Sequence, residues 1–349
     1  MSNAKRLFLH FRRTPAFVGF TLFVFVLVLN IVVQGPTHFF SSRSLNTLFS
    51  KNMPLLLTTM AMAPLLISGT LDISIGIQLA LVNVVSIMVF QEWGVSLYVG
   101  FSMGMLASLA VSALCWALVS VVRLPSMLAS FALIYVVRGV NVLIMNKPQG
   151  KVPEAYYKTY DSLIGGVIPF SALILLFVLL IWLYLMRTKF GRNIYAVGGS
   201  PRNAFAAGIN PVWVQFQASM IKGVITGLAG ICLTLMTASG NPLQGEAYGL
   251  RALSACIIGG LGFGGWGSMA CAVFGAGFLV TIQNTVYYFF NLLYRIIPGF
   301  TVTSYWQNLV SDIIIFFGLL MTIVTAKEQR EALRQGFVKQ FKGGESATQ

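Results

Sequence analysis

Long apolar runs separated by short polar segments dominate the chain. Nine runs, each bounded by polar, Gly or Pro residues, cover 16–34, 54–68, 73–90, 95–122, 125–146, 166–186, 212–238, 267–290 and 303–325. A hydrocarbon core about 30 Å thick needs about 20 apolar residues per helical span, so each run predicts a membrane-crossing helix. The pattern therefore predicts an all-α polytopic membrane protein with a single domain over residues 1–349.

The composition excludes a soluble domain, because 57% of the residues are hydrophobic, 9% are charged and the mean hydropathy is +0.81. The net charge of +14 comes from basic residues scattered at the ends of apolar runs, which favours membrane topology over a nucleic-acid partner. Four cysteines lie in apolar or glycine-rich segments without metal-ligand spacing, so we expect packing roles for Cys115, Cys232, Cys256 and Cys271.

Basic residues predict the orientation. Lys5, Arg6, Arg12 and Arg13 precede the first run, which is too long for a signal peptide and is followed by no small-residue cleavage site. If segment 1–15 is cytoplasmic, six crossings return loop 187–211 to the cytoplasm, where the basic tail 326–349 is also expected. An even number of crossings must then separate loop and tail. The short stretch Leu250–Gly260 supplies the missing one, which gives about ten transmembrane helices.

Two interruptions of the apolar pattern are expected, near residues 64–76 and 249–267. Non-helical backbone at membrane depth needs shielding by protein or by a water-filled cavity. Interruptions at comparable places in two halves of a chain favour a transport site between them. We expect the glycines of these two regions to form the broken-helix backbone: Gly69, Gly76, Gly259, Gly260, Gly264, Gly265 and Gly267.

Asp72 is the only acid embedded in the first five spans, which makes it a functional candidate. It also suits the N-cap of the third span, so solute contact and helix capping both stay open. Other polar residues near the breaks could bind a hydroxylated solute or hydrogen-bond between helices. The candidate pathway residues are Asp72, Ser74, Gln78, Asn83, Ser126, Ser130, Asn141 and Asn284, with Gln283 beside the last.

Enzymatic chemistry finds no support in the motifs. Gly262–Gly267 fits G-x-G-x-x-G, but no strand precedes it and no acid follows at the required spacing. Gly150-Lys151 lacks the earlier glycine of a Walker A motif, and His10 and His38 suggest neither a triad nor a metal cluster. We therefore expect no catalytic residue, cofactor or metal in this chain.

A polar island from Arg187 to Asn210 lies between two apolar runs. Its T-K-F-G-R-N-I-Y-A-V-G-G at 188–199 and A-A-G-I at 206–209 resemble the cytoplasmic loop of sugar-type ABC importer permeases, the ribose, arabinose, xylose and galactoside branch. Further segments are similar to other motifs of that family, so the resemblance covers nearly the whole chain. They are D-I-S-I-G at 72–76, L-P-S at 124–126 continuing to R-G at 138–139, I-G-G at 258–260 and G-G-W-G at 264–267.

The resemblance implies a ten-span permease whose loop 187–211 carries a short coupling helix for a separate ATPase. Ser200-Pro201 is a credible start and Gly208 a credible stop for that helix, although an ordinary positive-inside loop is the alternative. The implied coupling residues are Gly191, Arg192, Tyr195, Arg202, Phe205, Gly208 and Ile209.

The implied partners are an ABC ATPase subunit that binds ATP and magnesium, an identical or paralogous second permease, an extracytoplasmic solute-binding protein and a small sugar-like substrate. Membrane lipid surrounds the chain and no nucleic acid is involved. The implied location is a bacterial inner membrane, crossed several times, with both termini in the cytoplasm.

The chain departs from the family pattern at Gly249 and Arg251, where the family has acids, and at Thr70, where it has a glycine. These changes indicate either an atypical substrate, such as an acidic sugar derivative, or pairing with a nonidentical permease. An ion-coupled secondary transporter that uses Asp72 and the broken helices is the alternative function.

Overall fold

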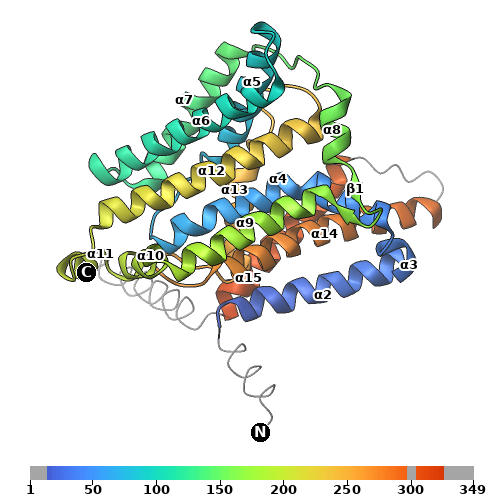
Figure 1. The fold of residues 1–349 in the computed structure, drawn as a ribbon. Coiled ribbons are helices and arrows are strands. Elements are labelled where there is room, and N and C mark those ends of the chain that lie inside the picture. The colour runs from blue at the N-terminus through green and yellow to red at the C-terminus, as the bar shows by residue number, and fades with distance from the viewer. Residues whose placement is uncertain (1–13, 297–303, 326–349) are drawn as a thin grey trace, which may run out of the picture.

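The computed structural model describes residues 14–296 and 304–325, which are mostly helical (Figure 1). The helices are α2 (Ala16–Gln34), α3 (Pro36–Phe39), α4 (Ser42–Ile67), α5 (Ile75–Glu92), α6 (Leu97–Trp116), α7 (Ser126–Ile144), α8 (Glu154–Tyr160), α9 (Phe170–Arg187), α10 (Lys189–Gly199), α11 (Pro201–Ala206), α12 (Pro211–Thr237), α13 (Tyr248–Ile258), α14 (Met269–Ile296) and α15 (Ser304–Thr325). A π-helical turn, Ala117–Val121, extends α6, and β1 (Leu163–Ile164) pairs antiparallel with β2 (Ile168–Pro169). The basic clusters expected in 1–13 and 326–349 lie outside the described residues.

Seven helices of the described ranges are long and apolar enough to cross a membrane: α2, α5, α6 with its π-helical extension, α7, α9, α12 and α14. Helix α4 has 26 residues, but its first half is polar. Helices α13 and α15 supply shorter apolar segments, Tyr248–Ile258 and Leu309–Gly318. The all-α polytopic fold class is confirmed, and these ten helices lie at the sequence positions of the ten predicted crossings; that all ten cross the membrane stays a prediction.

Helices α4, α5, α12 and α14 form the centre of the bundle, and α2, α6, α7 and α9 lie around it. In the most apolar 18-residue stretch of each helix, 67% of the α5 residues and 61% of the α14 residues are buried, whereas 17% of the α9 residues are buried. The outer helices expose large apolar side chains such as Leu143 and Phe177, as lipid-facing helices do. In Figure 1, α10, α11 and the start of α2 lie at one end of the bundle, and α3, α8 and the β hairpin lie at the other.

The start of α4 differs from the sequence expectation. The apolar run begins at residue 54, but the helix begins at Ser42, where the Ser41 hydroxyl accepts a hydrogen bond from the Ser44 amide. Pro64, expected to take part in the break, lies inside the helix. The polar residues of the first half line a pocket, so hydrophobicity alone could not reveal this part of the helix.

Both predicted interruptions are present. Helix α4 ends at Ile67 and α5 begins at Ile75, with Gly69 at φ +82° between them. The second interruption is longer, because irregular backbone lies on both sides of the short helix α13, at 238–247 and 259–268.

Small residues bring α13 very close to its neighbours. A Cβ atom added to Gly275 of α14 would lie 1.8 Å from the carbonyl oxygen of Ala255, and one added to Gly259 would lie 1.9 Å from that of Cys271. Glycine therefore permits backbone contact between α13 and α14, as small residues do in membrane helix pairs.

This packing predicts that Gly275→Ala destabilises the protein by about 1–3 kcal/mol, because the new methyl group overpacks a backbone contact. Gly139→Ala on α7 is the matched control, since nothing lies within 4 Å of its added Cβ. The measurement is the fraction of monodisperse protein after heating in detergent. Equal midpoints for the two variants would contradict the packing argument.

Candidate coupling site and transport pathway

The polar island folds into two helices. Helix α11 starts as expected, with Pro201 in its first turn and the Ser200 hydroxyl accepting a hydrogen bond from the Asn203 amide at 3.3 Å. It ends before Gly208, whose φ of +81° continues no right-handed helix. Helix α10, which the motif did not predict, precedes it and buries Phe190, Gly191, Ile194 and Val197 on one face.

The predicted coupling residues divide into two groups. Arg192, Arg202, Phe205 and Gly208 are exposed, and 70% of the Phe205 surface is accessible. Gly191, Tyr195 and Ile209 pack against the bundle instead. The exposed group provides one aromatic and two basic side chains for a partner.

The island meets both helix interruptions at one place, the glycine junction, made of Ile67, Tyr195, Gly198, Gly264 and Gly265. The amides of Gly264 and Gly265 donate to the carbonyl oxygens of Leu66 and Ile67 at 3.0 and 2.9 Å, at the end of α4. A Cβ on Gly198 of α10 would lie 1.9 Å from the Ile67 oxygen. Three segments far apart in the sequence therefore share backbone contacts.

Tyr195 adds a side-chain contact to this junction, because its hydroxyl donates to the Gly267 carbonyl at 3.0 Å. Burial raises the pKa of the Tyr195 phenol, so it stays a neutral donor. Of the seven glycines predicted for the broken backbone, Gly69, Gly264, Gly265 and Gly267 lie in or beside the junction.

The other three predicted glycines serve close helix contacts. Gly259 and Gly260 contact α14 and the residues just before α2. A Cβ on Gly76 would lie 2.6 Å from the Glu246 oxygen, so the start of α5 contacts the backbone that leads into α13.

Asp72 forms a buried ion pair that sequence reasoning missed. Its Oδ2 lies 2.6 Å from Nζ of Lys222 on α12, and both side chains are at most 3% exposed. Lys222 also donates to Oε1 of Gln78 at 3.0 Å, and the Gln78 amide donates to Ser74 Oγ at 2.8 Å. As the only charged residue in the run 212–238, Lys222 was the signal that could have been noticed.

The capping expectation for Asp72 needs a correction. Ser74 occupies the N-cap position of α5, and Asp72 lies two residues before it. The Asp72 carboxylate accepts the Ser74 amide at 2.9 Å and also the Ser74 hydroxyl. This is the Asx-turn geometry that aspartate favours before a helix, so Asp72 has a local structural role in addition to the ion pair.

Asn83 and Asn141 hold the irregular backbone before α13. Asn83 Oδ1 accepts the Asn241 amide at 2.8 Å, and Asn141 Nδ2 donates to the Pro242 carbonyl at 3.2 Å. The adjacent residue Gly240 ties the same part of this segment to the loop after α7, because Gln149 and Gly240 exchange backbone hydrogen bonds of 3.1 and 3.0 Å.

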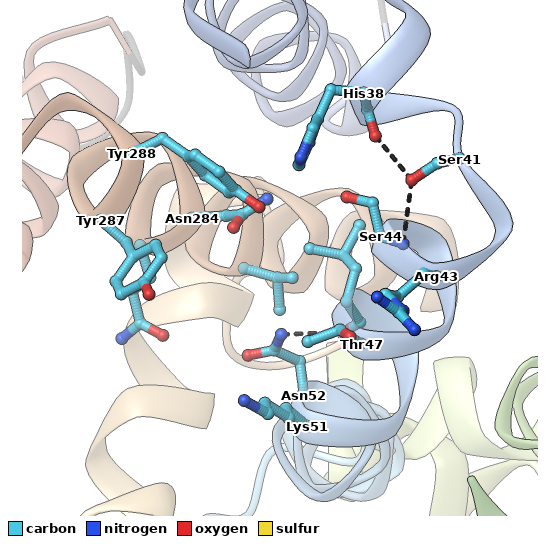
Figure 2. Close-up of a pocket in the computed structure, with 13 residues that line it drawn as sticks. His38, Ser41, Arg43, Ser44, Thr47, Lys51, Asn52, Asn284, Tyr287 and Tyr288 are labelled. Carbon is cyan, nitrogen blue, oxygen red and sulfur yellow. Dashed lines mark hydrogen bonds between the residues drawn. The ribbon is translucent and has the colours of Figure 1, made fainter. Parts of the chain in front are cut away.

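The remaining pathway candidates lie elsewhere. Ser126 is partly exposed at the start of α7, and the buried Ser130 donates to the Met127 carbonyl of its own helix. Asn284 lines a pocket of about 400 Å³ between α3, the first half of α4 and α14 (Figure 2). The predicted pathway residues therefore do not form one site. Some belong to the Asp72–Lys222 cluster, some hydrogen-bond the irregular backbone before α13, and Asn284 lines a separate pocket.

Comparison with known proteins agrees with these features. A family described as "Branched-chain amino acid transport system / permease component" matches residues 44–322. The inner membrane ABC transporter permease protein YjfF of Escherichia coli is 28% identical over 304 residues, which cover 85% of this chain and 88% of the relative.

Two further relatives are similar over most of their length. The ribose import permease protein RbsC of Bacillus subtilis is 27% identical over 90% of this chain and 94% of its own. The D-allose transport system permease protein AlsC of Escherichia coli is 27% identical over 74% of this chain and 81% of its own. No solved structure matches the chain significantly.

The family match spans both interruptions and the island, and seven described helices have the length and hydropathy of membrane spans. The chain therefore belongs to the family of branched-chain amino acid transport system / permease components and is a multi-pass inner-membrane permease subunit of an ABC importer.

Proposed function

We propose that this permease imports a small sugar-like solute, forms its pathway with a second permease, and is driven by a separate ATPase subunit that binds ATP and magnesium. An extracytoplasmic binding protein delivers the solute. The relatives named for ribose, D-allose and galactose or methyl galactoside import support this substrate class.

The proposed orientation places both termini and the island in the cytoplasm. Arg187, Lys189, Arg192 and Arg202 gather in the island, at the end of the bundle where α2 begins. An excess of basic residues in short loops favours the cytoplasmic side.

The observation that carries the proposal is the glycine junction. Helix α11 is exposed, whereas α10, just before it, contacts the end of α4 and the glycine segment after α13. Force applied to α11 by an ATPase therefore reaches both helix interruptions through backbone contacts, which deform less readily than long side chains.

A second connection runs through α12. Only residues 207–210 separate α11 from this continuous helix of 27 residues, and Lys222 lies in its first half. Movement of α12 shifts Lys222 relative to Asp72, which lies in the break before α5. We propose that this ion pair couples the coupling helix to the pathway, so Asp72 acts by positioning the break.

Purification from the native membrane tests the proposed assembly, with an ATPase and a second permease expected to copurify. Vesicles reconstituted with this assembly and supplied with the binding protein should then accumulate solute when ATP is present. Uptake driven by an ion gradient without ATP would contradict the proposal and favour a secondary transporter.

The exposed face of α11 predicts that Phe205→Ala weakens ATPase binding by about 2 kcal/mol or more, because truncation of a central aromatic contact typically has this cost. Phe177→Ala on the lipid-facing side of α9 is the matched control, since 59% of that side chain is also exposed. The measurement is copurification of the ATPase with each variant. If the ATPase copurifies normally with Phe205→Ala, then α11 is not part of the surface that binds the ATPase.

The buried ion pair predicts that the losses of stability caused by substituting Asp72 and Lys222 do not add in the double variant. Lys222→Met or Asp72→Leu alone should destabilise the protein by about 3–5 kcal/mol, because an unpaired charge stays buried, whereas the double variant should recover most of the stability. The exposed pair Lys158–Glu154 serves as control, and Lys158→Met should change stability by less than about 1 kcal/mol.

Thermal stability and ATP-driven uptake are both measured on these variants. The double variant is expected to fold but to lose coupled transport. A double variant that transports normally would show that the pair has no part in coupling.

A further inference from the structure

The pocket of about 400 Å³ between α3, α4 and α14 has two polar walls that face each other (Figure 2). On α4, Arg43, Thr47 and Lys51 are spaced by four residues and therefore lie on one face of the helix. On α14, Asn284 and Tyr288 have the same spacing. The volume lies in the range of about 300–1,000 Å³ typical of small-molecule sites.

The pocket has an uncompensated positive charge. Arg43 and Lys51 are exposed, and neither forms an ion pair with an acid in the part of the chain that the structure describes. None of the lining residues is acidic. The pocket therefore favours a negatively charged ligand.

Lys51 extends the positive charge of this wall along α4. It lies nine residues beyond the start of the helix, about 14 Å along the axis at 1.5 Å per residue. It belongs to the polar first half of α4, before the apolar stretch that begins at residue 54, and it lines the pocket without an acid beside it in the described part of the chain.

Neutral donors complete the lining. The side-chain nitrogen of Gln283 is buried and lacks a hydrogen-bond partner among residues 14–296 and 304–325. Ser44, Asn52 and Asn284 also line the pocket and can bind hydroxyl groups. Cationic groups beside amides and hydroxyls suit a ligand that has both an anionic group and several hydroxyls.

We propose that this pocket binds the transported solute and that the solute is a hydroxylated compound with a carboxylate or phosphate group, such as a sugar acid or sugar phosphate. The proposal rests on the import function above and narrows its substrate class. Arg43 and Lys51 hold the anionic group, and the amides of α14 bind hydroxyls.

An anionic lipid headgroup has the same charge as such a solute. Arg43 and Lys51 would hold the anionic group of either ligand, whereas only a polyhydroxylated solute would also use the amides of Asn52 and Asn284. The test therefore separates the solute from the lipid.

The experiment uses the complete importer, purified with its ATPase and reconstituted in phosphatidylcholine nanodiscs. The probes are matched pairs: D-glucuronate with D-glucose, D-galacturonate with D-galactose, and ribose 5-phosphate with D-ribose. Binding is measured by equilibrium dialysis of labelled probe. We expect at least one acid to bind at least tenfold more tightly than its neutral counterpart, with an affinity that falls as salt increases.

Substitutions of the two cationic residues test whether the preference for an acidic probe arises in this pocket. Arg43→Gln and Lys51→Gln should each weaken binding of the preferred acid by about tenfold or more, the loss expected for one charge-assisted hydrogen bond. Lys151→Gln is the matched control, because that lysine is exposed outside the pocket. Thermal stability without ligand checks that each variant folds.

Three results would overturn the inference: equal or weaker binding of every acid, unchanged binding in Lys51→Gln, or an effect of the substitutions that depends on added phosphatidylglycerol and not on the probe. Uptake is measured separately, in sealed vesicles that contain the same importer and are supplied with its binding protein. If Lys51→Gln imports a neutral sugar with ATP, the import function stands and the anionic substrate is ruled out. If no probe is imported with ATP, the import function itself is contradicted, whatever the binding result.

Discussion

The need to pair buried backbone polar groups governs this structure. A helix end that is buried against its neighbours leaves carbonyl groups without partners unless other protein groups supply donors. Here the amides of Gly264 and Gly265 pair with Leu66 and Ile67, so one interruption caps the other. The close approach of Gly198 depends on the same arrangement, because any larger residue would collide with the Ile67 carbonyl.

Much of the polar interior satisfies the same requirement. Asn83 and Asn141 bind backbone groups of the irregular segment before α13, and Asp72 binds the amide of Ser74. These residues looked suitable for a solute because they are polar at membrane depth. Their contacts show that supporting a broken helix requires the same chemistry, so polarity within a span does not by itself distinguish a support from a binding site.

Hydropathy predicted most of the fold because each apolar run had clear boundaries, and Ser200, Pro201 and Gly208 predicted α11 because helix capping is a local property. The first half of α4 escaped prediction, since its polar residues face a pocket that only the packing of α14 creates. Lys222 was recognisable as the only charge of the run 212–238, but its pairing with Asp72 joins residues 150 positions apart, so no local pattern could identify the partner. The site was therefore predictable where it depends on local sequence, and unpredictable where it depends on which helices become neighbours.

The bridge between Gln149 and Gly240 gives the segment 238–268 an unusual position in the molecule. At one end it is hydrogen-bonded to the loop that follows α7, and at the other to the end of α4 beside the island. The short helix α13 lies between these two connections and also packs against α14. Its position therefore depends on backbone contacts at both ends of the bundle, and one short segment joins the loop after α7 to the surroundings of the island.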